Sequence, residues 1–167
     1  MRKPTDIFPT EKPIIFAMGL SMSSRLWVPA LLMDSYEVKL THDVGQLLRD
    51  LNTAEKLPSL ILLDCQMPLV VHEEIFSQIK RNSEIWRIPV VLVGSPINDD
   101  DELRGFEQGA ADFITLPCSP DIFKAKIRAR LTQNVNSNIV CLINEQLELV
   151  VARQTVEIGT VQDASIR

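Results

Sequence analysis

The sequence is short of the residues on which many catalytic and metal sites depend. Its 167 residues include only three cysteines and two histidines. Cys65, Cys118 and Cys141 are odd in number and irregularly spaced, which argues against a disulfide framework or a zinc site and suits a reducing compartment. His42 and His72 form no cluster with the cysteines or with each other. The pattern therefore argues against a metal ion and against a catalytic triad.

Long apolar runs and basic stripes are missing as well. No stretch approaches the about 18 consecutive apolar residues of a membrane span. The charged start Met1-Arg2-Lys3 is not followed by the apolar core and cleavage site of a signal peptide. The formal net charge is −5, and without a basic stripe it argues against a nucleic-acid or anionic-membrane partner. We expect a cytoplasmic protein with one domain of ordinary size followed by an extension.

The most informative stretch runs from Leu60 to Pro68 and reads LILLDCQMP. Four consecutive large apolar residues between Pro58 and Pro68 predict a strand buried on both faces, as in the centre of a parallel sheet. The run stops at Asp64, at the carboxyl end of the strand, where open α/β sheets bind their ligands. Asp64 either belongs to such a site or caps a turn through its own backbone. This stretch alone fits both interpretations.

Strand-like and helix-like segments alternate five times. Apolar runs predict strands over residues 13–18, 36–40, 60–64, 88–94 and 112–117, each followed by a helical pattern. Ser23 or Ser24, Asp43, and Ser119 before Pro120 are the expected helix caps, and Gly109 is the expected helix end. The acidic run at 98–102 complements a helix dipole and is no metal cluster. Strict alternation predicts a parallel sheet with helices on both faces.

The segment after residue 132 has a different pattern. Residues 133–138 are polar but contain no glycine or proline, so the fifth helix either continues through them or breaks briefly. An apolar stripe with about 3.67 residues per turn then follows, a period that gives a nearly straight helical pair. It consists of Ile139, Ile143, Leu147, Val150, Gln154, Ile158 and Val161, and is widened by Leu142, Leu149 and Val156. The stripe packs either on the sheet domain or, as we favour, in a parallel homodimer.

With five strand–helix units and Leu-Leu-Asp-Cys-Gln-Met-Pro at 62–68, the chain resembles the receiver domain of two-component response regulators. The resemblance covers about residues 12–132. Ile-Pro-Val-Val at 88–91, Gly-Phe-Glu-Gln-Gly-Ala-Ala-Asp at 105–112 and the Pro117 turn support it. It implies an α/β flavodoxin-like (CheY-like) (βα)5 three-layer sandwich with the parallel strand order 2-1-3-4-5. It also places Asp64 at the phospho-acceptor position and a cis-proline junction at Leu116-Pro117.

The rest of the family's site is missing from the matching positions. Phosphoryl transfer to a carboxylate relies on Mg²⁺, cationic groups and hydroxyl groups to stabilise the charge. Where the family has an acidic pair, this sequence has Ala17-Met18-Gly19. Where the family has a hydroxyl, it has Gly94, with Ser95 beside it, and where the family has a lysine, it has Leu116. A shift of one residue turns Ser95 to the other face of the strand. We therefore expect a degenerate receiver, or pseudo-receiver, that is not an enzyme and holds neither Mg²⁺ nor another cofactor.

The tail has a resemblance of its own. Residues 144–150, 153–157 and 160–167 look like the linker helix that joins receivers to HD-GYP domains, a family that hydrolyses cyclic di-GMP. The metal-ligand motif of that family is absent from this sequence. With the receiver resemblance and the proline- and charge-containing start of the chain, the resemblance of the tail predicts a leader over 1–11, a receiver-like domain over 12–132, and a helical linker and dimerisation segment over 133–167. An effector domain would follow in a longer chain.

Three functions remain open at this point. The first is a pseudo-receiver that works without phosphorylation or is weakly phosphorylated, dimerises through its tail and relays a signal to an effector such as an HD-GYP phosphodiesterase. Its input would be another signalling protein or a small ligand, on the surface of the fourth helix, fifth strand and fifth helix. The second is a receiver that accepts phosphate from a histidine kinase on Asp64, against which the missing acidic pair, Gly94 and Leu116 weigh. The third is a structural dimerisation unit without an input.

Overall fold

The computed structural model describes residues 11–19, 28–95 and 98–165, with side chains as far as Val156 except at Ser137. A helical turn at 28–32 lies between the first two strands. The leader, apart from its last residue, and the cap expected at Ser23 or Ser24 lie outside the described residues. The elements follow in the order β1 (Ile14–Met18), β2 (Glu37–Thr41), α2 (Val44–Thr53), β3 (Leu60–Asp64), α3 (Leu69–Arg81), β4 (Val90–Gly94), α4 (Asp99–Gln108), β5 (Asp112–Thr115) and α5 (Pro120–Ser165).

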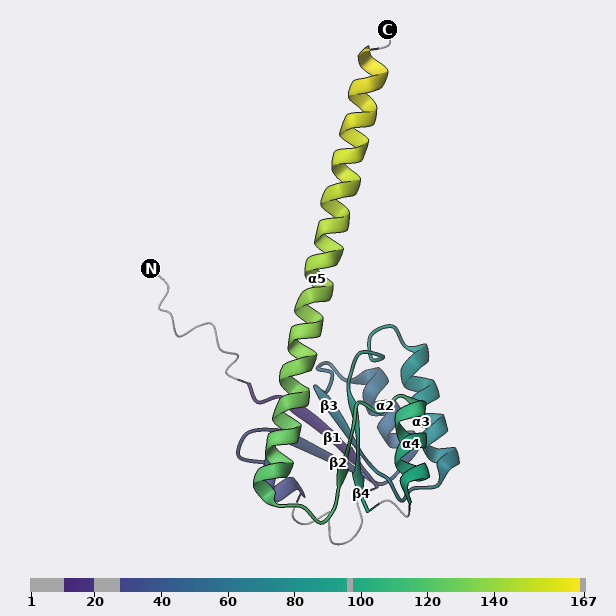
Figure 1. The fold of residues 1–167 in the computed structure, drawn as a ribbon, viewed down its shortest axis with the longest axis vertical. Coiled ribbons are helices and arrows are strands. Elements are labelled where there is room, and N and C mark those ends of the chain that lie inside the picture. Colours follow the sequence, from purple (N-terminus) through teal and green to yellow (C-terminus); the bar gives the residue numbers. More distant parts are fainter. Residues whose placement is uncertain (1–10, 20–27, 96–97, 166–167) are drawn as a thin grey trace, which may run out of the picture. The chain divides into compact units, whose positions relative to one another are not determined.

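The five strands form one parallel sheet in the order β2-β1-β3-β4-β5 (Figure 1). This confirms the predicted fold class and strand order. β3 lies at the centre of the sheet between β1 and β4, and all five of its residues are buried. The unbroken apolar run follows from this position, because both faces of a central parallel strand are covered.

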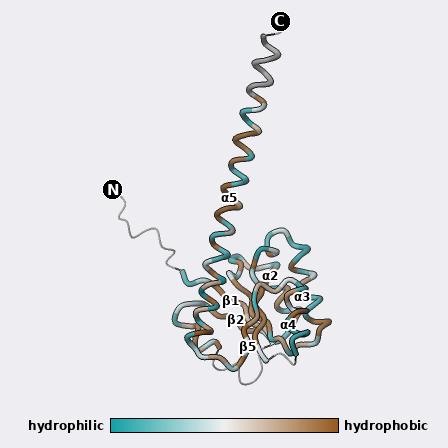
Figure 2. Tube along the Cα trace, in the orientation of Figure 1, coloured by the Kyte–Doolittle hydropathy of each residue, from teal (hydrophilic) through white to brown (hydrophobic). Residues whose placement is uncertain are grey.

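Side chains alternate between two cores, one on each face of the sheet. Phe16, Ile61 and Leu63 belong to the core covered by α2 and α3. On the opposite face, Ile15 and Leu62 belong to a core that includes Phe123 of α5. Figure 2 shows apolar residues concentrated in the strands. Each large apolar side chain buried in this way contributes about 1.5–3 kcal/mol to folding. The result is a sandwich of three layers.

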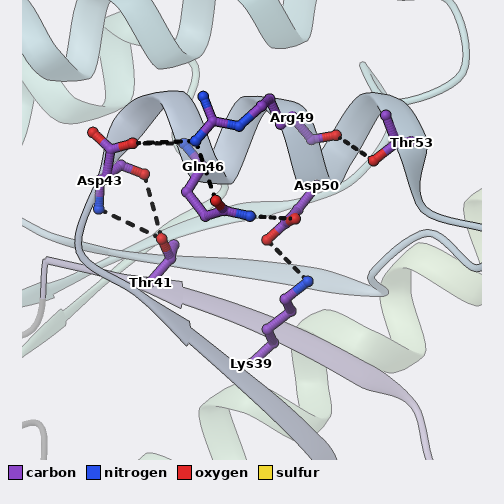
Figure 3. A network of polar contacts seen from close by, with 7 residues as sticks. All are labelled: Lys39, Thr41, Asp43, Gln46, Arg49, Asp50 and Thr53. Atoms are coloured by element: carbon purple, nitrogen blue, oxygen red, sulfur yellow. Dashed lines mark hydrogen bonds and ion pairs between the residues drawn. The ribbon is translucent and has the colours of Figure 1, made fainter.

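A polar network fixes α2 against the edge strand β2 (Figure 3). Asp43 caps the helix, because its Oδ2 accepts a hydrogen bond of 2.9 Å from the Gln46 backbone N–H. Lys39 of β2 forms an ion pair of 2.9 Å with Asp50, which lies in the second turn of α2. The Gln46 side-chain amide donates a 2.8 Å hydrogen bond to the same carboxylate. Asp50 therefore joins strand and helix at a site only partly open to water.

The ends of several elements differ slightly from the predicted ones. β2 covers Glu37–Thr41, one residue later than expected, and β4 begins at Val90. Pro89 has no N–H to donate to the sheet, although its carbonyl accepts a 3.0 Å bond from the Ile61 N–H. Gly109 ends α4 with a φ of 117°, as predicted for a helix-ending glycine.

Helix α5 begins as predicted and continues through the polar segment at 133–138. Ser119 caps it, accepting a 3.3 Å hydrogen bond from the Ile122 N–H. Arg130 donates a 3.0 Å hydrogen bond to Asp112 of β5. The chain divides between Leu131 and Thr132 into two units, residues 1–131 and 132–167. Among the described residues, no helix has both the length and the apolar character needed to cross a membrane.

Candidate functional site

The candidate site lies at the carboxyl edge of the sheet, where β3 ends at Asp64. This carboxylate is only 5% exposed. In the sheet, Asp64 pairs with Val93 of β4, Leu63 pairs with Met18 of β1, and Gly94 pairs with Thr115 of β5. The parallel register therefore brings the ends of β1, β3, β4 and β5 together at one edge. The pocket positions singled out in the sequence lie at or beside these strand ends, whereas the tail residues lie on α5.

The loop after β3 is held by hydrogen bonds on Asp64 itself. Its Oδ1 accepts a 2.8 Å bond from the Gln66 backbone N–H, the turn-capping arrangement that the sequence left open. Its backbone carbonyl lies 2.8 Å from Nε2 of His72, a residue only 5% exposed. Because a carbonyl only accepts, Nε2 of His72 donates this bond and carries the hydrogen. The aspartate is thus part of a fixed turn, with one oxygen already engaged.

A thioether fills the place where the acidic pair was sought. Met18 is buried in the core, and Gly19 follows it with a φ of 74°, a value that favours glycine. A Cβ atom built on Gly19 would overlap the Sδ atom of Met67. Any larger residue at 19, an aspartate included, would have to displace the Met67 side chain.

A thiol fills the place where the hydroxyl was sought. Gly94 has a φ of 146°, and a Cβ atom there would lie 2.5 Å from Sγ of Cys65 and 3.4 Å from Oδ1 of Asp64. Ser95, next in sequence, donates its hydroxyl to the Leu116 carbonyl at 2.6 Å. The one hydroxyl at the end of β4 is therefore committed to the backbone of the β5–α5 junction.

Leu116 completes the edge without a charge. Its side chain is half-buried and packs against the core that contains Ile15 and Val93. The following Leu116–Pro117 peptide bond is cis, at the position where the resemblance placed such a bond. Cys118, beyond the proline, packs against the same core. An apolar side chain thus occupies the position where the resemblance placed a lysine.

The side-chain donors that the structure describes at this edge do not fit a Mg²⁺ ion. Mg²⁺ requires near-octahedral oxygen coordination, usually from carboxylates and water. Asp64 brings one carboxylate, whereas Met18 and Gly19 bring no side-chain oxygen. Among the residues that the structure describes, no group of three or more His, Cys, Asp or Glu side chains could hold a metal ion.

Cys65 is a poor nucleophile despite its place beside Asp64. Burial, followed by the negative charge of Asp64, raises the pKa of its thiol to about 11. The thiol is therefore protonated at neutral pH, the form in which cysteine is a weak nucleophile. Beside it, a pocket of about 280 Å³ opens between the β3–α3 loop and α4, with His72 and Arg104 among its lining residues.

Sequence reasoning did not identify the contacts that Met67, Cys65 and His72 make. Met67 and Cys65 belong to the motif after β3, but nothing in the sequence relates them to Gly19 and Gly94. The contacts join residues more than 25 positions apart, and only the folded sheet edge brings them together. His72 stands in the second turn of α3, eight positions after the carbonyl it binds, and no local pattern identifies that bond.

The tail residues selected for dimerisation lie on one helix and are exposed. Ile139, Leu142, Ile143, Leu147 and Val150 are between 49% and 57% exposed. The side chain of Ile158 lies outside the described residues. Figure 2 shows apolar residues alternating with polar ones along this part of α5. The exposed stripe is available to a partner helix.

Comparisons with known proteins agree on one family. The model of the response regulator receiver domain matches residues 22–128. The chain is 35% identical over 107 residues to a Vibrio cholerae protein named "Probable cyclic di-GMP phosphodiesterase", a match that covers 64% of this chain and 24% of that protein. It is 30% identical over 116 residues to the response regulator PleD of Caulobacter vibrioides, covering 70% of this chain and 25% of PleD. The chain thus spans about a quarter of the length of these curated relatives.

Solved structures show the same fold. The chemotaxis response regulator CheY4 of Vibrio cholerae has a TM-score of 0.62 at 21% identity, covering 71% of this chain and 98% of CheY4. The receiver domain of a sensor histidine kinase from Pseudomonas aeruginosa PAO1, solved with a magnesium ion coordinated in its active-site cleft, has a TM-score of 0.63 at 17% identity. That match covers 72% of this chain and 98% of the Pseudomonas domain.

Proposed function

The chain belongs to the response regulator receiver domain family, and from this starting point we propose that it is a pseudo-receiver, which passes on a signal without an aspartyl phosphate. The observation that carries the proposal is the packing of two sulfur-bearing side chains. Met67 lies against Gly19, and Cys65 lies against Gly94. These two glycines stand where the family has an acidic group and a hydroxyl, so the phosphorylation pocket is filled by the protein's own β3–α3 loop.

The electrostatics support the same proposal. A phosphoryl group adds about two negative charges near neutral pH. Placed on a nearly buried carboxylate, these charges need a metal ion, a cation or hydrogen-bond donors close by. Leu116 offers no cation, Gly94 offers no hydroxyl, and the described edge of the sheet lacks the oxygen ligands of Mg²⁺. Transfer of a phosphoryl group to Asp64 would therefore be strongly disfavoured.

Signal output runs through the tail in this proposal. The exposed apolar stripe of α5 forms a parallel homodimer, which brings two copies of a downstream effector together. An HD-GYP phosphodiesterase is the effector that the tail pattern supports, and a relative at 35% identity carries the name of a cyclic di-GMP phosphodiesterase. This segment lacks the metal-ligand motif of such an enzyme, so the activity would belong to the effector.

The input would reach the surface formed by α4, β5 and α5. Leu103 and Phe106 on α4 and Ile122 on α5 are large apolar residues that are 43–57% exposed. Exposed apolar residues of this kind suit a signalling protein as partner. The pocket beside Cys65 offers a second entry point, for a small ligand.

Phosphorylation itself is the test. The 167-residue chain would be incubated with acetyl phosphate and Mg²⁺, and its intact mass measured beside the magnesium-binding Pseudomonas receiver domain. We expect no phosphoryl adduct and, by calorimetry, no Mg²⁺ binding. Asp64→Asn is the matched control, since the amide oxygen can still accept the bond from the Gln66 N–H.

The second candidate is a phosphorylatable receiver that takes phosphate from a histidine kinase. The position of Asp64 at the end of the central strand favours it. A phosphoryl adduct on the unaltered chain that disappears with Asp64→Asn would establish this function and reject the pseudo-receiver.

A further inference from the structure

The pocket of about 280 Å³ between the β3–α3 loop and α4, named here the α4 pocket, has walls of mixed chemistry. The loop and the start of α3 contribute Met67 and Leu69, and β4 contributes Leu92. Helix α4 contributes Asp101 and Arg104. Pockets that hold drug-sized ligands have volumes of about 300–1,000 Å³. The α4 pocket is slightly smaller, which suits a small metabolite.

A buried hydrogen-bond acceptor at this pocket has no partner in the protein. His72 lines the pocket and is 5% exposed. Its Nε2 donates to the Asp64 carbonyl at 2.8 Å, so Nδ1 of the neutral ring is an acceptor. Within the described part of the chain, this ring makes no second hydrogen bond. Because buried polar groups are nearly always hydrogen-bonded, Nδ1 calls for a donor that the protein itself does not supply.

Two opposite charges line the same pocket from one side of α4. Asp101 and Arg104 are three positions apart on this helix. Among the described residues, neither side chain has an ion-pair partner. The charge of Asp101 also acts on the opposite wall: burial and then Asp64 raise the pKa of the Cys65 thiol, and Asp101 raises this pKa further. The helix thus offers one anion and one cation to a ligand.

These groups together select a ligand that carries both charges. One guanidinium and one carboxylate balance each other, so the pocket suits a zwitterion better than a phosphate ester, whose roughly two negative charges would need more cations. Met67, Leu69 and Leu92 provide contacts for an apolar body. No phenylalanine, tyrosine or tryptophan is among the described lining residues, whereas proteins commonly stack nucleobases on such rings. A small amino acid with an apolar side chain meets all of these conditions.

We propose that the α4 pocket binds a free amino acid with an apolar side chain. The carboxylate of the ligand binds the Arg104 guanidinium, and its ammonium group binds the Asp101 carboxylate and Nδ1 of His72. Its side chain packs against Met67. This inference deepens the proposed function by naming the class of ligand, and it rests on that function for the role of the ligand as the input. The His72 ring joins the ligand to the turn after β3, because its Nε2 holds the Asp64 carbonyl.

Binding is measured by calorimetric titration of the 167-residue chain with L-leucine, L-isoleucine, L-valine, L-methionine and L-phenylalanine. At least one of them should bind. L-glutamate and L-lysine should bind at least about tenfold more weakly, because the apolar wall would desolvate their charged side chains. The two halves of the ligand should also lose at least about tenfold in affinity. For L-leucine these are isocaproic acid, which lacks the amine, and isoamylamine, which lacks the carboxylate.

Three variants test whether the ligand lies in the α4 pocket. Arg104→Gln removes the cation and Asp101→Asn removes the anion, and each should lower the affinity at least about tenfold. His72→Gln keeps a donor near the place of Nε2 for the Asp64 carbonyl but loses the acceptor at Nδ1, so it should weaken binding as well. Arg49→Gln, at an exposed position of α2, is the matched control and should leave the affinity unchanged. Circular dichroism and urea unfolding check that each variant is folded.

The outcomes separate this inference from the proposed function. Failure of all five amino acids to bind would overturn the inference, as would binding that neither Arg104→Gln nor Asp101→Asn weakens. Equal affinity for isocaproic acid or isoamylamine would overturn the recognition of a zwitterion. The proposed function is judged by phosphorylation instead: a phosphoryl adduct on Asp64 would reject the pseudo-receiver whether or not an amino acid binds. A chain with neither binding nor adduct would remain a pseudo-receiver, without this ligand.

Discussion

Replacing Gly94 by alanine should destabilise the domain, although it adds one methyl group. The backbone at Gly94 has a φ of 146°, which L-residues rarely adopt, and the new Cβ would lie 2.5 Å from Sγ of Cys65. The conformational cost is about 1–2 kcal/mol, and forcing a side chain aside in a packed site costs about 1–3 kcal/mol. We therefore expect the free energy of unfolding to fall by about 2–5 kcal/mol.

The assay is urea unfolding followed by circular dichroism at one fixed protein concentration, because association changes apparent stability. Gly45→Ala is the matched control. Gly45 lies within α2 and has no positive φ, and a Cβ there would lie 3.1 Å from Oδ2 of Asp43 and 3.2 Å from Arg49, both ends of exposed side chains that can shift. Alanine there should therefore change the free energy of unfolding by no more than about 1 kcal/mol. A second series is made in a Cys65→Ala background, which removes the sulfur. There the cost of Gly94→Ala should fall to the conformational part alone.

Two results would refute this reasoning. A loss below about 0.5 kcal/mol for Gly94→Ala, within the usual range of neutral surface changes, would mean that the site adapts freely. An equal loss with and without Cys65→Ala would mean that the thiol does not occupy the space, because independent sites add and contacting sites do not.

Three further predictions concern the fold around the site. The hydrogen bond from Lys39 holds the pKa of Asp50 below its usual value; the stability it contributes is present above the pKa of the unfolded chain and is lost as the pH falls through the lower folded value. Unfolding curves from pH 7 to pH 2 should therefore show a smaller loss for Asp50→Asn than for the wild type, the difference being up to about 1 kcal/mol. The thiol of Cys65, with its pKa raised to about 11, should react with iodoacetamide at pH 8 far more slowly than free cysteine, as mass spectrometry would show. Because the unfolded thiol ionises near its model value of 9.0, stability should also decline between these two values, and less so in Cys65→Ala. Phe123→Ala, at a fully buried position of α5, should lower the free energy of unfolding by about 3–5 kcal/mol in urea. Ile122→Ala, at a position 52% exposed, should lower it by under about 1 kcal/mol. Equal losses would mean that Phe123 does not lie on the face of α5 that packs against the sheet.

The fold could be predicted from sequence because its signals are local. The apolar run ending at Asp64 predicted a central strand, and the lack of glycine and proline at 133–138 left the helix free to continue. The ends of the strands were less predictable. β4 begins only at Val90 because Pro89 has no N–H to donate to the neighbouring strand.

The site was predictable as a set of missing groups but not as a filled space. The resemblance to receivers placed a hydroxyl at position 94 and a lysine at position 116, where the sequence has glycine and leucine. It could not show that Met67 and Cys65 occupy the space, because those contacts depend on how β1, β3 and β4 align at the edge of the sheet. The exposure of the tail stripe likewise required the folded helix.

The packing of Met67 against Gly19 and of Cys65 against Gly94 also sets the order in which changes at this site can be made. An aspartate at 19 or a threonine at 94 meets a sulfur atom before it can meet Mg²⁺ or phosphate. Each single step toward a phosphorylatable site therefore lowers stability and brings no chemistry in return. A path that first shortens Met67 and Cys65 opens room, but leaves a cavity until the polar residues arrive. If the chain is the pseudo-receiver proposed above, several coupled substitutions separate its site from phosphorylation, and an engineer would have to make them together.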